Sequence, residues 1–232
     1  METIVQVFDK FLEAQQVRLK KTTFNRYKSV MQLFESYMNS YAYNYLEKKE
    51  QKLFWTKYKN EKKEFCEIFD IKKMTNSEVS EFLSYFMIRK VTGSKELMKN
   101  TGRVLRKFIK WLKDNSYIDN NKFEILDETI NELKDDLPKV VELANIFYEE
   151  ATKNSFRQYE IYKESHFIIK KVEAGKLWLE DYDYIDSDMK IGPVIVPEKI
   201  SSFVREGWTA YLELGRKNKR WYITGSGNVY PN

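Results

Sequence analysis

The side chains whose types and spacing form the clearest functional pattern in this sequence are cations. Between residues 93 and 118, lysines and arginines recur at spacings of three and four residues. On a helix with about 100° per residue, these positions fall within an arc of roughly 80°. This basic stripe consists of Lys95, Lys99, Arg103, Arg106, Lys110 and Lys113. Because aligned cations at these spacings repel one another, the stripe predicts a polyanionic partner or neutralisation by acidic residues of the same chain.

Residues suited to catalysis or metal binding are scarce. The chain of 232 residues has one histidine, His166, and one cysteine, Cys66. A single cysteine excludes an internal disulfide and a zinc cluster, and it fits a reducing compartment. The acidic run at 181–188 lacks the central glycine and distal glutamate of a calcium loop. The sequence therefore predicts no cofactor, no metal site and no enzymatic activity.

Apolar runs are short throughout the chain, and none is long enough to span a membrane. The N-terminal METIVQVFDKFLEAQQ is amphipathic and carries acids early, unlike a secretory signal. We therefore expect a soluble cytoplasmic protein.

Glycine and proline divide the chain into two parts. The first 137 residues contain no proline, and six of the eight glycines lie after residue 174. A stretch without these residues favours helices, whereas glycine-rich punctuation favours strands and turns. The pattern predicts an α+β protein of two domains, joined between residues 150 and 163, with no sheet before residue 160.

Charge divides the chain again. Residues 1–114 hold 24 Lys and Arg against 14 Asp and Glu, whereas residues 115–160 hold 5 against 11. Residues 161–232 are nearly balanced, with 11 against 10. Such asymmetry indicates an acidic partner for the basic half. We expect a helical domain at 1–118, an acidic helical extension and linker at 119–160, and a small domain at 161–232.

Local signals mark the starts of three helices. Thr22 or Thr23 can cap the second helix, and the segment Thr75–Glu78 has the pattern of a capping box. Pro138 fits the first turn of a helix capped by Asp136, so the acidic segment should divide into two helices near residue 136.

The segment after residue 160 predicts a small β-domain. Alternating apolar residues and turn residues indicate a hairpin of two strands at 165–172 and 176–182. Three more short strands are expected at 194–196, after Gly192-Pro193, and at 208–214 and 220–224. Such a small sheet must close or cover its edges, so we expect an SH3-like β-barrel. The favoured interpretation of its aromatic residues is that they form the core of the barrel, and the alternative is that they line a groove for a peptide or for stacked bases: Trp178, Trp208, Trp221, Tyr222 and Tyr230.

Four segments of the first half follow one another in a recognisable order: VFDKFLEAQQ (7–16), KKTTFNRYKSVMQLFESYM (20–38), MTNSEVSEFLSYFMIRK (74–90) and VLRKFIKWLKDNSYI (104–118). They resemble the helices of the N-terminal SAM-like, or core-binding, domain of phage integrases and other tyrosine recombinases. The resemblance covers about residues 1–118 and implies an all-α SAM-like bundle that binds duplex DNA. The segment 43–73 looks longer than the family usually carries, and Gly102 occupies a helix position where an apolar residue is expected.

In that family the second and last helices lie near the DNA groove. The resemblance therefore implies phosphate contacts from the second helix, through Lys20, Lys21, Thr22, Thr23, Arg26 and Lys28. It implies further contacts from the last helix and its start, through Lys95, Lys99, Arg103, Arg106 and Lys110. Cations and hydroxyls of this kind position a backbone and specify no base.

The catalytic domain of the family has no counterpart in this chain. Tyrosine recombinases use a His-x-x-Arg element, but His166 is followed by Phe167, Ile168 and Ile169. The resemblance therefore implies DNA binding without strand cleavage, as in a non-catalytic relative of proteins that act in DNA recombination. The alternative is a protein-interaction adaptor that uses the aromatic face of the barrel.

Overall fold

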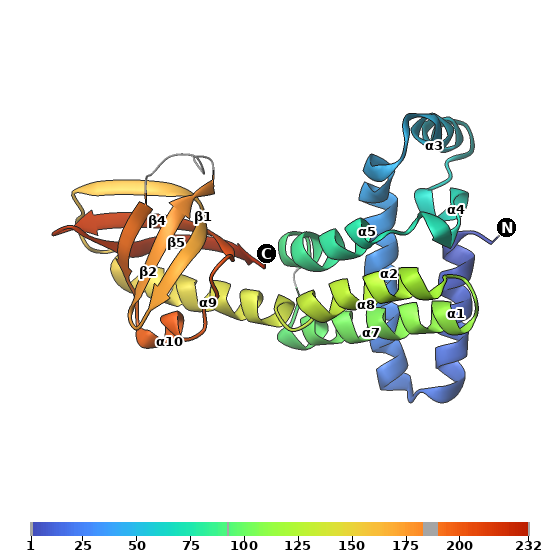
Figure 1. Cartoon of the computed structure of the whole chain (residues 1–232), viewed down its shortest axis with the longest axis horizontal. Coiled ribbons are helices and arrows are strands. Elements are labelled where there is room, and N and C mark those ends of the chain that lie inside the picture. Colours follow the sequence, from blue (N-terminus) through green and yellow to red (C-terminus); the bar gives the residue numbers. More distant parts are fainter. Residues whose placement is uncertain (1, 92, 183–189, 232) are drawn as a thin grey trace. The chain divides into compact units, whose positions relative to one another are not determined.

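The computed structural model describes residues 2–91, 93–182 and 190–231. It confirms the α+β class, because helices fill the first part of the chain and a five-stranded sheet fills the last part (Figure 1). The chain divides into two compact units. The first unit comprises Met1–Met87 with Glu96–Asp135, and the second comprises Ile88–Lys95 with Asp136–Asn232.

The helices up to residue 133 follow the predicted order with additional short turns. They are α1 (Ile4–Arg18), α2 (Lys21–Tyr41), α3 (Lys48–Glu61), α4 (Phe65–Ile68), α5 (Asn76–Glu81), α6 (Met87–Arg89), α7 (Lys95–Asp114) and α8 (Asn120–Leu133). A π-helical turn at Phe82–Phe86 connects α5 to α6. Within the described residues the first strand begins at Ile161, which confirms the prediction of no sheet before residue 160. The only earlier strand-like pairing among these residues is an isolated bridge between Thr3 and Asp70.

Aromatic rings form the centre of the first unit. The ring centroid of Phe108 on α7 lies 5.2 Å from that of Phe8 and 5.1 Å from that of Phe11, both on α1. Phe8 also stacks on Phe34 of α2 at 5.8 Å. Ring pairs of this geometry add to the stabilisation that comes from burying their area. These contacts fix α1, α2 and α7 against one another and determine which side of α7 faces solvent.

The predicted side-chain caps are confirmed at one helix and wrong at two. Thr75 caps α5 in a capping box with Glu78, as its local pattern predicts. Helix α2 instead begins at Lys21 after the N-cap Lys20, so Thr22 and Thr23 lie inside its first turn. The apolar side of α2 is buried, and this packing sets its start without a side-chain cap.

The acidic segment divides near residue 136 as predicted, and α9 (Leu137–Asn154) has Pro138 in its first turn. Asp136 occupies the N-cap position, but its side chain does not cap the helix. Its carboxylate pairs with Arg205 at 2.5 Å instead. A charged partner from the β-domain has thus displaced the local cap.

The second unit contains the five predicted strands: β1 (Ile161–Glu173), β2 (Lys176–Asp181), β3 (Lys190–Ile195), β4 (Thr209–Lys217) and β5 (Arg220–Tyr230). They close in the order β1-β2-β3-β5-β4, because β4 pairs with β1. Only the β3–β5 pair is parallel among these five strands. A short helix, α10 (Glu198–Ser201), follows Pro197. Strand β5 is longer than predicted, because the glycine-rich segment 225–230 continues it.

Helix α9 belongs to the β-domain and not to a linker. Leu143 and Phe147 of α9 are fully buried in one core with Phe167 and Leu212 of the sheet, and Figure 1 shows α9 running along the strands. The units therefore divide between Asp135 and Asp136, earlier than the expected join at 150–163. The expected segment 119–160 is split, because α8 packs in the first unit and α9 in the second.

The structure bears on the expectations about membrane-spanning helices, the acidic run and metal sites only for the residues that it describes. Over the ranges that the structure describes, no helix has both the length and the apolar character needed to cross a bilayer. Most of the acidic run at 181–188 lies outside the described residues, which resume at Lys190. No group of three His, Cys, Asp or Glu side chains is placed for a metal ion in residues 2–91, 93–182 and 190–231.

Candidate nucleic-acid interface

The position of the basic stripe follows from the buried side of α7. The apolar residues of α7 that the sequence predicted to be buried are inside the core: Met98, Val104, Leu105, Phe108, Ile109 and Leu112. The cations lie on the opposite side of the helix and are exposed, except for the half-buried Lys113. The core therefore fixes the rotation of α7 and presents the stripe outward.

One side of the stripe is neutralised within the chain. Lys95 pairs with Glu142 of α9. Arg106 binds Asp127 of α8, with its Nε 2.8 Å and its Nη2 3.2 Å from the two carboxylate oxygens. The ammonium group of Lys113 lies 4.4 Å from the ring centroid of Phe123, also on α8. The acidic segment thus offsets part of the repulsion, as the intramolecular alternative predicted.

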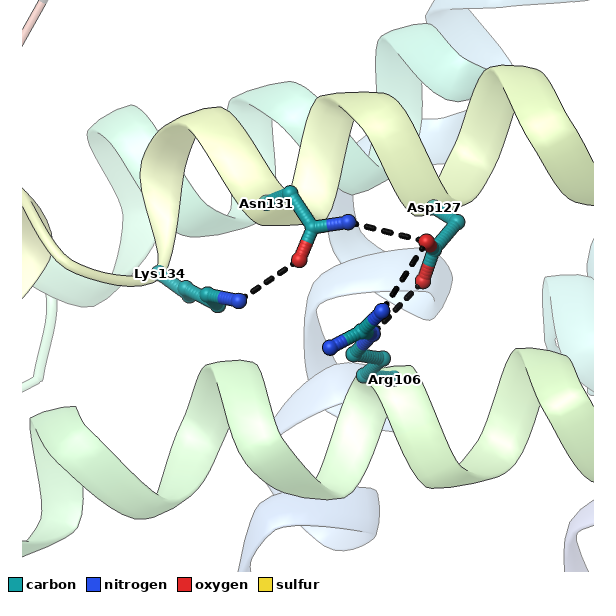
Figure 2. A network of polar contacts seen from close by, with 4 residues as sticks. All are labelled: Arg106, Asp127, Asn131 and Lys134. Atoms are coloured by element: carbon teal, nitrogen blue, oxygen red, sulfur yellow. Dashed lines mark hydrogen bonds and ion pairs between the residues drawn. The ribbon is translucent and has the colours of Figure 1, made fainter.

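Arg106 is the first member of a polar network between α7 and α8 (Figure 2). The side-chain amide of Asn131 donates to Asp127 at 2.8 Å, and Lys134 donates to Asn131 at 2.6 Å. The hydrogen bonds from Arg106 hold the pKa of the Asp127 carboxyl below its ordinary value. The same bonds raise the pKa of Arg106. Arg106 is therefore engaged with α8, although the sequence grouped it with the phosphate-binding residues.

The other side of the stripe carries cations that form no ion pair among the described residues. Lys99, Arg103 and Lys110 are exposed, and the described residues place no carboxylate in an ion pair with any of them. Lys107 is also exposed and lies about 40° further round the helix than Arg103. We call this set the open edge of α7: Lys99, Arg103, Lys107 and Lys110. The basic stripe defined from the sequence does not include Lys107, because this residue lies outside the arc of roughly 80° that defines the stripe.

The predicted residues of α2 do not all join this surface. Five of the six are exposed, namely Lys20, Lys21, Thr22, Arg26 and Lys28, and Thr23 is half-buried. Arg26 reaches the first turn of α7 and pairs with Glu96 at 2.6 Å. At about 100° per residue, Lys21 and Lys28 lie roughly 140–160° around α2 from Arg26. They therefore point away from the contact with α7, and the two helices do not form one continuous basic face.

The exposed face of α8 bounds the open edge with negative charge. A hollow of about 560 Å³ along this helix is lined by Phe123, Glu124, Asp127, Glu128, Asn131 and Glu132. Of its carboxylates, Asp127 binds Arg106, and the others add negative charge to the surface. A phosphate backbone would be repelled along this face of α8, which favours the open edge as the side of α7 available to a polyanion.

The aromatic residues considered for a groove in the β-domain lie in different environments. Trp208 is buried in the core with 2% of its surface exposed. Trp178 covers Gly192 and carries Lys171 over its ring, whereas the ring of Tyr222 lies 5.9 Å from that of Tyr159. Because Trp221 and Tyr222 are adjacent in β5, their side chains point to opposite faces of the sheet. Trp208 is therefore a core residue, as the favoured interpretation predicts, and Trp221 and Tyr222 do not share one face of the sheet.

Comparison of the chain with protein family models, with curated proteins and with solved structures finds no match. The geometry of the side chains is therefore the basis for assigning a function.

Proposed function

We propose that this protein binds duplex nucleic acid without cleaving it, through phosphate contacts from the open edge of α7. The observation that carries the proposal is the pairing pattern along this helix. The acidic segment engages Lys95 and Arg106, but it leaves Lys99, Arg103, Lys107 and Lys110 exposed. Cations that the chain itself does not neutralise are available to a polyanion.

The dimensions of the open edge suit a duplex. From Lys99 to Lys110 the helix rises about 16 Å, at 1.5 Å per residue. Double-stranded DNA presents one negative charge per about 1.7 Å of its axis, so four flexible cations over this length can each reach a phosphate. Lysine and arginine contacts of this kind fix the register of a duplex and specify no base. We therefore expect binding with little sequence preference.

The resemblance to the core-binding domain of tyrosine recombinases supports the same assignment. In that family the last helix of a SAM-like bundle lies near the groove, and α7 is its counterpart here. The closed five-stranded sheet is what we expect of an SH3-like barrel. We accordingly propose a non-catalytic, integrase-like protein that acts in the cytoplasm, where a lone thiol such as that of Cys66 stays reduced.

A salt series tests the proposal. With four phosphate contacts, the logarithm of the association constant for duplex DNA should fall against the logarithm of salt concentration with a slope of about −3.6. The double variant Arg103→Ala, Lys107→Ala should bind every duplex more weakly and flatten this slope by about two. Lys21→Ala, Lys28→Ala is a matched control, because it removes the same charge from the side of α2 that points away from α7.

Two outcomes would contradict the assignment. Equal losses in the two double variants would show that total charge, and not the open edge, attracts DNA. Duplex affinity that does not change with salt would exclude phosphate contacts altogether.

A second candidate is a protein-interaction surface on the β-domain. The ring of Tyr159 contacts those of Tyr162 and Tyr222, with centroids 5.9 Å apart in both pairs. Arg157 lies over Tyr222, and 65% of Tyr162 is exposed. Exposed aromatic and arginine side chains are typical of binding hot spots. If this surface is the main one, Tyr162→Ala will abolish capture of peptides from an array, whereas the open-edge variants will not.

A further inference from the structure

Helix α3 is a basic element that the resemblance to integrases does not explain. It lies in the segment 43–73 and is drawn beside α4 at the top of Figure 1. Phe54 is its buried residue, and its ring packs on Phe65 of α4 with centroids 6.3 Å apart. The rest of the helix is largely exposed. Helix α3 is thus attached to the first unit along one side and presents the remainder of its surface to solvent.

The charge on this helix is unbalanced. Residues 48–63 contain seven lysines and two glutamates. Both glutamates are occupied, since Glu50 pairs with Lys73, and Glu61 pairs with Lys57 at 2.5 Å and Lys63 at 2.9 Å. The other lysines of the segment have no carboxylate partner among the described residues: Lys48, Lys49, Lys52, Lys59 and Lys62.

An exposed tryptophan lies between three of these lysines. Trp55 has 41% of its surface exposed. Lys48, Lys52 and Lys59 are seven residues before, three before and four after it, spacings that place side chains on the same face of a helix. Glu50 and Glu61 lie roughly 120–140° around the helix from Trp55. We call Trp55 with these three lysines the α3 patch.

Neighbouring aromatic rings hold the indole in place. Tyr43 meets Trp55 edge to face, with centroids 5.2 Å apart and ring planes at 64°. Tyr58 does the same at 5.9 Å and 90°. These contacts restrict the side chain of Trp55 while leaving part of its surface exposed. A restricted, exposed indole loses little conformational entropy when a flat group stacks on it.

We propose that the α3 patch binds single-stranded nucleic acid, with a base stacked on Trp55 and adjacent phosphates paired with Lys48, Lys52 and Lys59. Unpaired bases offer a free face to an aromatic ring, and their backbone supplies negative charge at close spacing, so one ligand satisfies both features of the patch. A duplex satisfies only the lysines, because its bases are stacked on one another. The patch therefore goes beyond the duplex surface proposed for α7.

Tryptophan fluorescence of the full chain provides a direct test. Addition of a short oligothymidylate should quench part of the emission, and Trp55→Phe should remove this quenching while retaining most of the affinity, because phenylalanine still stacks. The other four tryptophans remain in the variant, so the lost component belongs to Trp55. Quenching that survives the substitution would overturn the proposal.

Affinity measurements with matched variants complete the test. Trp55→Ala should weaken binding of a labelled oligothymidylate about tenfold, the effect of losing one stacked base. Leu53→Ala is the control, because Leu53 is comparably exposed, at 46%, and lies roughly 160° around the same helix. Lys52→Gln, Lys59→Gln should flatten the salt dependence of single-strand binding. Equal effects of Trp55→Ala and Leu53→Ala would contradict a role for stacking.

The two nucleic-acid surfaces can be separated. The α3 variants should leave duplex affinity within about twofold of the parent, whereas Arg103→Ala, Lys107→Ala should weaken duplex binding and spare the quenching by oligothymidylate. Loss of duplex binding alone would therefore leave the α3 assignment intact. Loss of oligothymidylate binding alone would leave the assignment of the open edge of α7 intact. If the protein binds phosphatidylserine vesicles through Trp55 and does not bind oligothymidylate, the α3 assignment is overturned in favour of a lipid surface.

Discussion

Arg103 and Arg106 lie one helical turn apart on α7 and have different surroundings. Arg106 binds Asp127 through two of its nitrogens, whereas Arg103 has no carboxylate partner in the described part of the chain. Both side chains are exposed, so exposure alone does not distinguish a cation that is available to a ligand from one that is already paired. We therefore expect Arg103 to act in binding and Arg106 in stability.

Replacing Arg106 with Gln should reduce stability in a pH-dependent way. The pair with Asp127 is partly exposed, so its loss should cost about 0.5–1 kcal/mol of the free energy of unfolding at pH 7. The folded-state pKa of Asp127 lies below its ordinary value of 3.8. Its contribution is therefore present above that value and is lost as the pH falls through the lower folded-state pKa. Urea unfolding at a series of pH values should show the gap between parent and variant closing below about pH 4.

Arg103→Gln is the matched control for this experiment. It removes the same charge one turn away and should leave the free energy of unfolding unchanged at every pH. A gap between parent and Arg106→Gln that widens towards low pH would contradict the assigned role of Asp127.

Which cations are paired could not be predicted from the sequence. The spacing of Lys99, Arg103 and Arg106 predicts a shared face on a helix, and the structure confirms this face. The pairing of Arg106 depends on where α8 packs, which is a long-range property that no periodicity encodes. Lys107 was missed for a related reason, because the width of an exposed face is set by the neighbouring helices and not by the helix itself.

At the scale of elements, Gly102 explains how closely α7 and α8 approach. A Cβ atom at this position would lie 2.4 Å from Cβ and 3.0 Å from Cα of Lys134, which follows the last turn of α8. A glycine inside a helix normally costs about 1 kcal/mol relative to alanine. The glycine at this position is therefore a packing requirement, because any side chain would force the two segments apart.

Gly102→Ala should destabilise the first unit in spite of its better helix propensity. The clash involves a backbone atom of Lys134, so relief requires a shift of the chain. Overpacking of this kind costs about 1–3 kcal/mol, more than the gain in propensity. The thermal midpoint should fall, and Asn100→Ala, at a half-buried position of the same helix, provides the comparison. A raised midpoint for Gly102→Ala would show that α8 can move away without loss.

A side-chain cap forms as predicted only where no tertiary contact competes for the capping residue. The capping box at Thr75 and Glu78 lies within one helical turn, and it forms as the sequence indicates. Asp136 has the same preference for capping, but its carboxylate pairs with Arg205, 69 residues further along the chain. A charge-assisted contact outweighs a local cap, and its existence depends on the tertiary fold.

At the scale of the whole molecule, the number and order of the strands were predictable, but the extent of the β-domain was not. Apolar patterning and turn residues marked the position of every strand along the chain. The assignment of α9 was missed because its acidic composition suggested a linker, although Leu143 and Phe147 are fully buried against the sheet. The acidic composition of α9 comes from its exposed side, whereas its buried apolar side determines with which unit the helix packs.

A fragment of residues 136–232 should fold, whereas a fragment of residues 161–232 should not. Burial of Leu143 and Phe147 contributes about 1.5–3 kcal/mol for each side chain, and this contribution is absent without α9. The longer fragment loses only the partly buried Ile88 from the apolar residues that line this core. Circular dichroism and urea unfolding should show a cooperative transition for 136–232. A similar transition for 161–232 would contradict the role of α9.

The order of the strands also constrains the assembly of the β-domain during synthesis. Strand β5 lies between β3 and β4, and it is the last strand in the sequence. Until residues 220–230 have left the ribosome, β3 and β4 each carry an edge whose backbone groups are unpaired. Such edges recruit strands from other chains. The first unit is complete in sequence after Asp135, so this protein should emerge with a folded helical unit and a β-domain that depends on its final strand for protection against aggregation.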